Sequence, residues 1–125
     1  MNTIGYAAFS AQTPLEPYRF ERRALRADDV SLDILFCGVC HSDLHEVRND
    51  WGTTHFPLVP GHEIIGRITA VGDAVTRFCP GDLVAVGTIV DSCGHCDQCQ
   101  EGQEQFCREG ATFTAGVPDR ITGEY

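Results

Sequence analysis

Apolar residues recur along this chain in short runs, and most of the runs alternate with polar residues. The clearest run covers residues 30–37, where every second residue is apolar: Val30, Leu32, Ile34 and Phe36. This alternation is typical of a half-buried strand. Similar runs at residues 4–9, 18–22, 63–71 and 83–90 are separated by segments that contain glycine, proline or charged residues. The pattern predicts a mainly β chain of short strands, with a barrel-like arrangement.

Little of the chain has a helical pattern. We expect one short helix, which Ser42 or Asp43 caps and which runs through Val47. Residues 93–107 show no apolar periodicity, and the tail at residues 110–125 has no face that could join a core. No Gly-x-Gly-x-x-Gly turn follows a strand, so we expect no dinucleotide-binding βαβ unit in this sequence.

Composition narrows the class of protein. The 125 residues are 42% hydrophobic and 22% charged, as expected for one soluble globular domain. Eighteen acidic and nine basic residues give a net charge of −9, which argues against nucleic acid and anionic membranes as partners. No transmembrane run and no secretory signal are visible. We therefore expect a cytoplasmic protein with reduced cysteines.

Four of the seven cysteines form a compact cluster, at Cys93, Cys96, Cys99 and Cys107. Two-residue gaps let backbone turns aim successive sulfurs at one point, and four thiolates close a tetrahedral zinc site. The alternatives are disulfides or inert thiols. The cluster predicts a structural zinc lobe over residues 91–109 that leaves no open coordination position. His95 lies inside the loop and is expected to be an exposed spectator.

A second set of metal-binding side chains is less complete. Cys40 offers a thiolate and His62 an imidazole, the ligand types that zinc prefers. Taken separately, either residue is more often structural. Glu63 follows His62 and is either a solvated charge or a carboxylate near the metal. A catalytic zinc keeps three protein ligands and one exchangeable position, so this pair lacks a ligand.

The combined motifs resemble the zinc-dependent medium-chain alcohol dehydrogenases. The resemblance is carried by Cys40-His-Ser-Asp, by Pro60-Gly-His-Glu and by the four-cysteine cluster, and it covers nearly the whole chain. Asn49-Asp-Trp-Gly, the prolines Pro57 and Pro60, and Ile89-Val-Asp-Ser-Cys are similar to the cinnamyl-alcohol-dehydrogenase-like branch.

This resemblance implies a GroES-like catalytic domain over residues 1–125, a distorted β-barrel with a protruding Cys₄ zinc lobe. It also implies that the chain ends before the family's Rossmann domain and before the third protein ligand of the catalytic zinc. The complete subunit would hold two zinc ions, one catalytic and one structural. NADP is the expected cofactor, with NAD as the alternative, and the complete enzyme is expected to be a homodimer.

The resemblance also implies a path for the proton that alcohol oxidation releases. Ser42 would hydrogen-bond the substrate oxygen, and His45 would relay the proton, with the link between them running through the cofactor ribose. The alternative for His45 is a surface histidine. Asp43 would accept a hydrogen bond from the imidazole of His62, and it could cap the helix as well.

Three further roles follow from the same resemblance. Glu63 would approach the metal and displace water transiently. His41 would face the cofactor phosphates. Trp51 would form a wall of the substrate pocket, suited to an aromatic or allylic aldehyde, or else would only anchor its loop. Cys37 is three residues from Cys40, but no redox fold surrounds the pair, so we expect a buried strand thiol.

The sequence thus predicts a zinc-dependent alcohol dehydrogenase or aldehyde reductase. It would transfer hydride between a primary alcohol or its aldehyde and NADP(H). The alternative is a stand-alone zinc-binding module that recognises another protein, with Cys40 and His62 incidental. Zinc stoichiometry separates these readings, because the complete enzyme should bind two ions and the module one.

Overall fold

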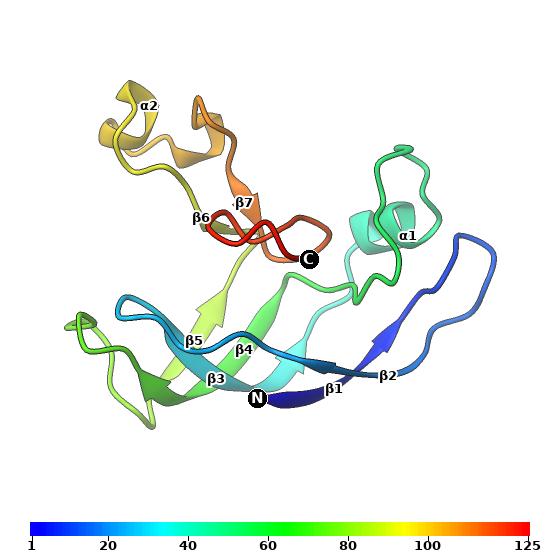
Figure 1. Ribbon diagram of the computed structural model, residues 1–125, viewed down its shortest axis with the longest axis horizontal. Coiled ribbons are helices and arrows are strands. Elements are labelled where there is room, and N and C mark those ends of the chain that lie inside the picture. The colour runs from blue at the N-terminus through cyan, green and yellow to red at the C-terminus, as the bar shows by residue number, and fades with distance from the viewer.

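The computed structural model describes all residues from 1 to 125. Strands dominate, and the three helical segments are short (Figure 1). In chain order the elements are β1 (Asn2–Ala7), β2 (Glu16–Glu21), β3 (Val30–Cys37), α1 (His41–Val47), β4 (Ile64–Val71), β5 (Leu83–Val86), β6 (Ile89–Asp91), α2 (Asp97–Gln100), the 3₁₀ turn η1 (Glu104–Phe106) and β7 (Thr112–Phe113). None of the helices has the length and apolar character needed to cross a membrane.

An antiparallel sheet in the order β3-β4-β5 forms the centre of the fold. β3 pairs with β4 from Val30 opposite Val71 to Cys37 opposite Ile64, with two irregularities in register. Gly66 of β4 allows this pairing, because a Cβ there would lie 2.4 Å from Cδ1 of Leu32. The predicted strand over residues 30–37 is therefore confirmed, with the bounds expected from its alternation.

The β1–β2 hairpin packs next to the loop that leads to His62. β1 and β2 pair antiparallel, and a short bridge joins Ala8 to Leu58. Its two backbone hydrogen bonds, Ala8 N to Leu58 O and the reverse, are 2.8 and 2.9 Å long. Ala7, Ala8 and Leu58 are buried there. This small core fixes the backbone just before the Pro60-Gly-His-Glu segment.

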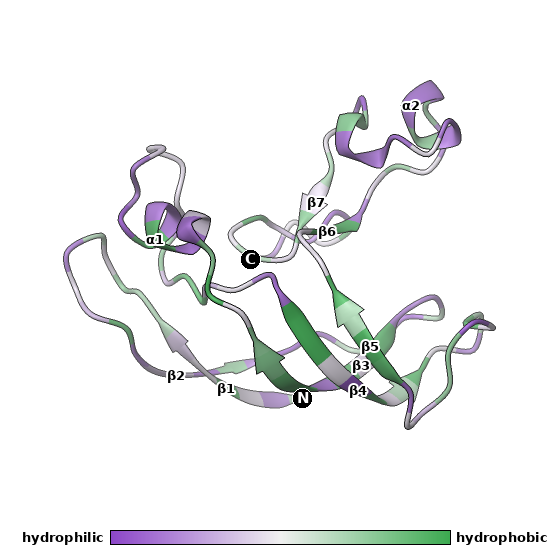
Figure 2. Cartoon of the chain, turned by 180° about the vertical axis from the view of Figure 1, so that it is seen from behind, coloured by the Kyte–Doolittle hydropathy of each residue, from purple (hydrophilic) through white to green (hydrophobic).

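Much of the apolar surface of the central sheet is uncovered. Figure 2 shows the hydrophobic colour concentrated on β3, β4 and β5, and the hydrophilic colour on α1 and α2. Ile34 is 59% exposed and Phe36 is 71% exposed, whereas Ile68 is buried. The expectation of a half-buried β3 face is therefore wrong for these two residues. Cys37 is also exposed rather than a buried strand thiol.

The single strand expected over residues 83–90 is two strands. β5 pairs with β4, whereas β6 leaves the central sheet and pairs with β7, so Ile89 lies opposite Phe113. The chain changes partner at Gly87 and Thr88. The tail, expected to have no core-facing side, contributes β7 and a turn around Asp119 that is hydrogen-bonded to the N-terminal half.

The cysteine-rich segment extends away from the sheet as a separate lobe (Figure 1). It contains α2 and η1, two turns of helix that its lack of apolar periodicity did not predict. The mainly β chain with a protruding cysteine lobe is confirmed.

Candidate functional site

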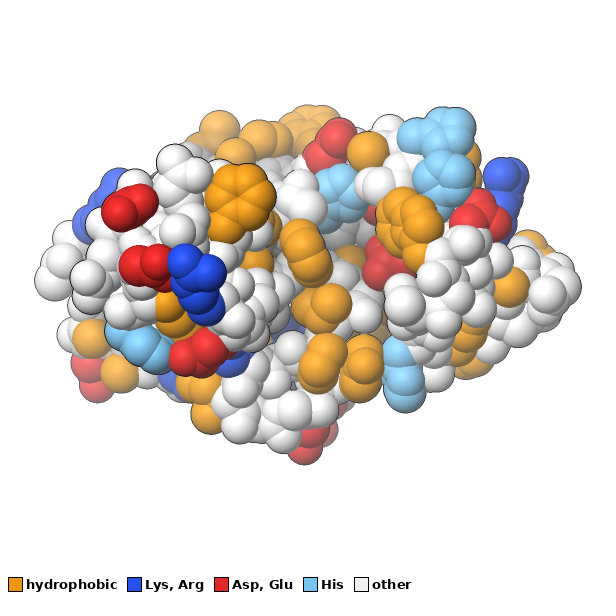
Figure 3. Space-filling view, turned by 90° about the horizontal axis from the view of Figure 1, so that it is seen from above, with side chains coloured by type: hydrophobic (Ala, Val, Ile, Leu, Met, Phe, Trp, Pro, Cys, Tyr) orange, Lys and Arg blue, Asp and Glu red, His pale blue; other side chains and the backbone are white.

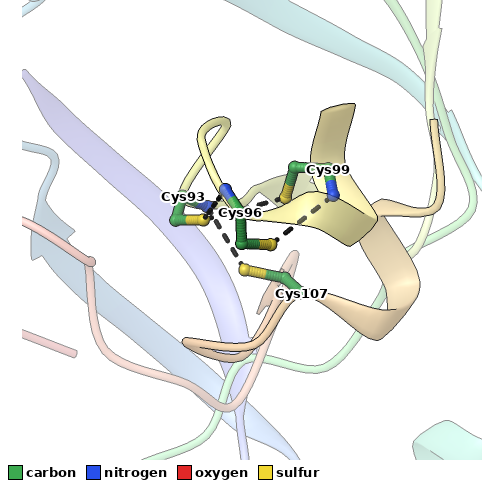
Figure 4. A group of neighbouring side chains, drawn as sticks. All are labelled: Cys93, Cys96, Cys99 and Cys107. Atoms are coloured by element: carbon green, nitrogen blue, oxygen red, sulfur yellow. Dashed lines mark hydrogen bonds between the residues drawn. The ribbon is translucent and has the colours of Figure 1, made fainter. Parts of the chain in front are cut away.

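The four lobe cysteines converge on one point (Figure 4). Cys93 precedes α2, Cys96 is its N-cap, Cys99 lies within it and Cys107 follows η1. All four thiols are free, and their sulfur atoms lie within 4.8 Å of one another. The Sγ atoms of Cys93 and Cys99 are 3.9 Å apart. A tetrahedral zinc with Zn–S bonds of about 2.3 Å places its sulfurs about 3.8 Å apart, so the cluster fits zinc.

Hydrogen bonds prepare these sulfurs for a cation. Backbone N–H groups donate to Cys93, Cys96 and Cys107 over 3.3 to 3.5 Å. The N–H of Cys93, followed by the Arg120 guanidinium, lowers the pKa of Cys107 to about 6. The backbone of His95 lowers the pKa of Cys93, but burial and the neighbouring thiols raise it to about 11. Crowded sulfurs of this kind are stabilised as thiolates when a metal lies between them.

Cys40, His62 and Glu63 form the second group of potential metal ligands, again with donor atoms within 4.8 Å of one another. Cys40 follows β3, and the other two residues precede β4. Because Cys37 is paired with Ile64, the adjoining ends of the two strands bring these residues together. The structure thus gathers all three predicted residues, at one end of the β3–β4 pair.

Asp43 and Ser42 of α1 contact both Cys40 and His62. Asp43 is only 7% exposed. Its Oδ2 accepts a hydrogen bond from the Cys40 N–H at 2.9 Å, and its Oδ1 lies 3.0 Å from Nδ1 of His62. The Ser42 Oγ lies 3.2 Å from Sγ of Cys40 and 3.4 Å from Nε2 of His62. Cys40 occupies the N-cap position of α1, and the Asp43 carboxylate caps the helix by accepting the Cys40 N–H. The expectation that Ser42 or Asp43 caps this helix is therefore confirmed for Asp43.

These contacts favour the charged forms of the two ligands. The Ser42 hydroxyl and N–H, followed by the His62 side chain, lower the pKa of the Cys40 thiol. Burial opposes protonation of His62, but contacts with Cys40 and Asp43 outweigh it and raise the pKa of the imidazole. A thiolate paired with a proton-bearing imidazole is an arrangement in which a metal ion can replace the proton. A soft sulfur, an imidazole nitrogen and a nearby carboxylate are a donor set that fits zinc.

His45 lies beside this group but is not hydrogen-bonded to Ser42. Its Nδ1 is 2.7 Å from Oδ2 of Asp50. Its ring lies 4.9 Å from that of His41 and 5.5 Å from that of Trp51, measured between centroids. The predicted relay residues are therefore neighbours on α1, without a direct bond between them.

A cavity of about 430 Å³ opens between α1, the Trp51 loop and the tail. Its lining residues include Ser42, Glu46, Trp51, His62, Phe113 and Gly116. Figure 3 shows histidine, acidic and hydrophobic side chains gathered over the side of the molecule that carries α1. Trp51 is 57% exposed and borders the cavity.

Sequence reasoning missed two parts of this cavity. Glu46 lies four residues after Ser42 on α1, so helical spacing could have placed both side chains on one face. The wall formed by residues 113–118 had no signal in the sequence, because only the β6–β7 pairing and the Asp119 contacts bring the tail there.

The chain is similar to known proteins over most of its length. Residues 26–125 match the alcohol dehydrogenase GroES-like domain. Aldehyde reductase YahK of Escherichia coli (strain K12) is 53% identical over 120 residues, covering 95% of this chain and 34% of that protein.

Solved structures agree with this match. The cinnamyl alcohol dehydrogenase SbCAD4 of Sorghum bicolor is 44% identical with a TM-score of 0.93, over 98% of this chain and 35% of that one. A structure titled CAD from Helicobacter pylori, complexed with NADP(H), is 44% identical with a TM-score of 0.87. The match covers 90% of this chain and 32% of that one. The expected GroES-like fold is confirmed. The chain spans about a third of the length of these relatives.

Proposed function

This chain belongs to the alcohol dehydrogenase GroES-like domain family, and on that premise we propose that it is the catalytic-domain part of a zinc-dependent alcohol dehydrogenase or aldehyde reductase. The reaction is hydride transfer between a primary alcohol or aldehyde and NADP(H). The observation that carries the proposal is the convergence of the donor atoms of Cys40, His62 and Glu63. Of these three residues His62 lines the cavity, together with Ser42 and Trp51. The closed four-cysteine cluster has no open position, so the chemistry belongs to the other group.

In this proposal Cys40 and His62 are ligands of the catalytic zinc, and Glu63 stands next to it. A zinc ion held by these residues would supply Lewis-acid polarisation of the substrate oxygen. Asp43 holds the Nδ1 side of His62, which leaves Nε2 facing Ser42 and the metal position. The hydroxyl of Ser42 lines the cavity between the two ligands, where it hydrogen-bonds the substrate oxygen.

His45 is the proposed proton relay. Its Nδ1 is held by Asp50, so the Nε2 side of the ring is free to take up or release a proton. Histidine suits this task because its imidazole titrates near neutral pH. The ring of His41 lies beside that of His45, and His41 is proposed to face the cofactor phosphates.

The finer parts of the proposal concern substrate and cofactor. NADP is favoured because a relative of similar fold was solved with NADP(H), with NAD as the alternative. The flat indole of Trp51 at the cavity suits an aromatic or allylic aldehyde. We place the complete enzyme in the cytoplasm and expect it to form a homodimer with two zinc ions per subunit.

The test is steady-state kinetics of the full-length protein with an aromatic aldehyde and NADPH. Cys40→Ser should abolish turnover, and Ser42→Ala should slow it without loss of zinc. His45→Gln should weaken or move the limb of the pH–rate profile near neutrality, whereas His95→Gln in the lobe should leave the profile unchanged. If the Ser42 and His45 variants keep the wild-type profile, the relay is removed from the proposal. Turnover that survives Cys40→Ser would overturn the zinc assignment.

A further inference from the structure

Glu46 is the acidic side chain of the cavity that the proposed chemistry does not use. It lies on α1, four residues after Ser42, and both residues line the same cavity. The side chain is partly buried rather than extended into solvent. Its backbone carbonyl accepts a hydrogen bond from the Thr54 hydroxyl at 2.6 Å, which fixes that turn of the helix.

The carboxylate of Glu46 has no ion-pair partner, because the nearby histidines are engaged with other acids. His45 contacts Asp50 at 2.7 Å, and His62 contacts Asp43 at 3.0 Å. Arg23 and Arg26 pair with Asp119, and no arginine forms an ion pair with Glu46. Glu46 is therefore a charged group at the cavity surface whose acceptor oxygens remain available to a ligand.

The tail holds this carboxylate in place. Gly116 has a φ of +74°, and a Cβ built on it would fall 1.6 Å from Oε1 of Glu46. The carboxylate thus occupies the space that a side chain at position 116 would need. A glycine there serves both the backbone conformation and the close approach of Glu46.

The surroundings of Glu46 disfavour further negative charge. Burial raises the pKa of its carboxyl, the charge of Asp43 adds to the rise, and His62 opposes it. A ligand hydroxyl next to Glu46 would supply the hydrogen bond that the partly desolvated carboxylate lacks. A ligand carboxylate would instead place like charges together in a cavity of about 430 Å³.

We propose that Glu46 is a specificity-determining residue, which favours substrates bearing a second hydroxyl group and disfavours substrates bearing a carboxylate. This inference rests on the proposed function, because it assigns the cavity to the alcohol or aldehyde. It extends that function by naming the substrate class: diols, polyols or hydroxylated aromatic alcohols.

The experiment compares three matched benzyl alcohols that differ only at the para position: hydroxymethyl, methyl and carboxylate. Their Kd values are measured on the zinc-loaded full-length protein without nucleotide. Trp51 lines the cavity and is the one tryptophan of this chain, so its fluorescence reports binding there. Any further tryptophan in the full-length protein is replaced by phenylalanine first.

The hydroxymethyl compound should bind wild type about tenfold more tightly than the carboxylate compound. Glu46→Gln, which removes the charge at nearly constant shape, should shrink that ratio to about one to threefold. Glu46→Asp keeps the charge and should keep most of the ratio. Glu16→Gln, an exposed substitution on β2, is the control and should leave the ratio unchanged. A ratio that is the same in wild type and Glu46→Gln would overturn the assignment.

The same ligands, followed by turnover, separate this inference from the proposed function. If no alcohol is oxidised with either nicotinamide cofactor, the proposed function fails, yet the Kd ratio still reports on Glu46. If turnover is normal but the kcat/KM ratio of the hydroxymethyl to the methyl compound does not fall in Glu46→Gln, the specificity role is wrong and the dehydrogenase assignment stands. Absence of any binding in the cavity would overturn the Glu46 proposal.

Discussion

Asp43 links the two ligand-bearing residues through one buried carboxylate. One oxygen accepts the N–H of Cys40, and the other lies 3.0 Å from the His62 ring. The first contact fixes the start of α1, and the second fixes the tautomer and direction of the imidazole. Helix capping and orientation of the imidazole, which the sequence allowed together, are therefore both carried by the one carboxylate of Asp43.

Replacing Asp43 by Asn should weaken zinc binding at Cys40 and His62. The amide keeps the shape but removes the charge that makes the imidazole a better donor, so we expect zinc affinity to fall about 10–100-fold. Competition with a chromophoric chelator on the full-length protein measures this. Asp50→Asn changes the carboxylate beside His45 and should leave zinc affinity unaltered. Equal affinity in wild type and Asp43→Asn would show that this contact does not tune the metal.

Residue chemistry allowed some of the site to be predicted and not the rest. Cys40 and His62 carry the ligand types that zinc prefers, and the resemblance of the motifs around them singled them out as candidates. The place of Glu46 in the cavity was not predictable, because an acidic residue on a helix is usually solvated, and the tail that brings Gly116 close to it gives no local signal in the sequence. Cys37 was expected to be buried and is exposed, because the alternation of apolar and polar residues does not show which face of a strand is covered.

At the scale of elements, the site depends on how strand ends are paired. Residues 30–37 and 64–71 were predictable because each is a continuous β-run, and their pairing brings Cys40 to His62. The break between β5 and β6 was not predictable, since the partner of β6 lies more than twenty residues later in the tail. Long-range pairing of this kind leaves no local pattern in the sequence.

The lobe of α2 and η1 should depend on its metal. Apart from the ligands Cys99 and Cys107, none of its side chains is buried, so metal ligation must offset the entropy of ordering it. Cys99→Ser should lower the zinc content by one ion per chain and make this lobe sensitive to proteases. His95→Gln removes an exposed imidazole and should change neither. Zinc content is measured by mass spectrometry, and stability of the lobe by timed proteolysis. If Cys99→Ser keeps its full zinc content and its full resistance to protease, the ligand assignment is contradicted.

The tail is attached to the N-terminal half through Asp119. Its carboxylate accepts hydrogen bonds from Arg26 at 2.7 and 3.0 Å and contacts Arg23 at 3.2 Å. The next residue, Arg120, reaches Sγ of Cys107 at 3.6 Å and the Gly110 carbonyl at 3.0 Å. Two adjacent side chains thus tie the cavity wall to the segment between β2 and β3 and to the cysteine lobe.

Asp119→Asn should destabilise the chain at neutral pH and much less in acid. The Arg26 hydrogen bonds lower the pKa of Asp119 below its usual range. A lowered pKa contributes stability that is present above the unfolded value of about 4 and is lost as pH falls toward the folded value. The difference in Tm between wild type and variant should therefore shrink below about pH 4. Asp28→Asn, in the neighbouring loop, serves as the control, and a pH-independent difference would contradict the ion-pair explanation.

At the scale of the whole molecule, the sequence was sufficient to predict the fold class. It was not sufficient to predict which apolar residues would be exposed. Short punctuated strands and one cysteine cluster suffice to indicate a mainly β chain with a metal lobe. Yet Ile34, Phe36 and Leu83 are 59%, 71% and 61% exposed, although their pattern predicts burial. The alternation of apolar and polar residues shows which face of a strand is apolar. It carries no information about what packs against that face.

The two metal groups should differ in how firmly the 125-residue chain holds zinc. Four convergent sulfurs offer a closed set of strong donors, whereas Cys40 and His62 offer two, with Glu63 beside them. Dialysis against a mild chelator should therefore leave about one zinc per chain. Cys40→Ser should not change that number, and Cys99→Ser should lower it to about zero. The full-length protein should retain about two, because a third ligand would complete the catalytic group, whereas a zinc-binding interaction module would retain one. Two firmly bound ions on the 125-residue chain would show that Cys40, His62 and Glu63 form a complete site by themselves.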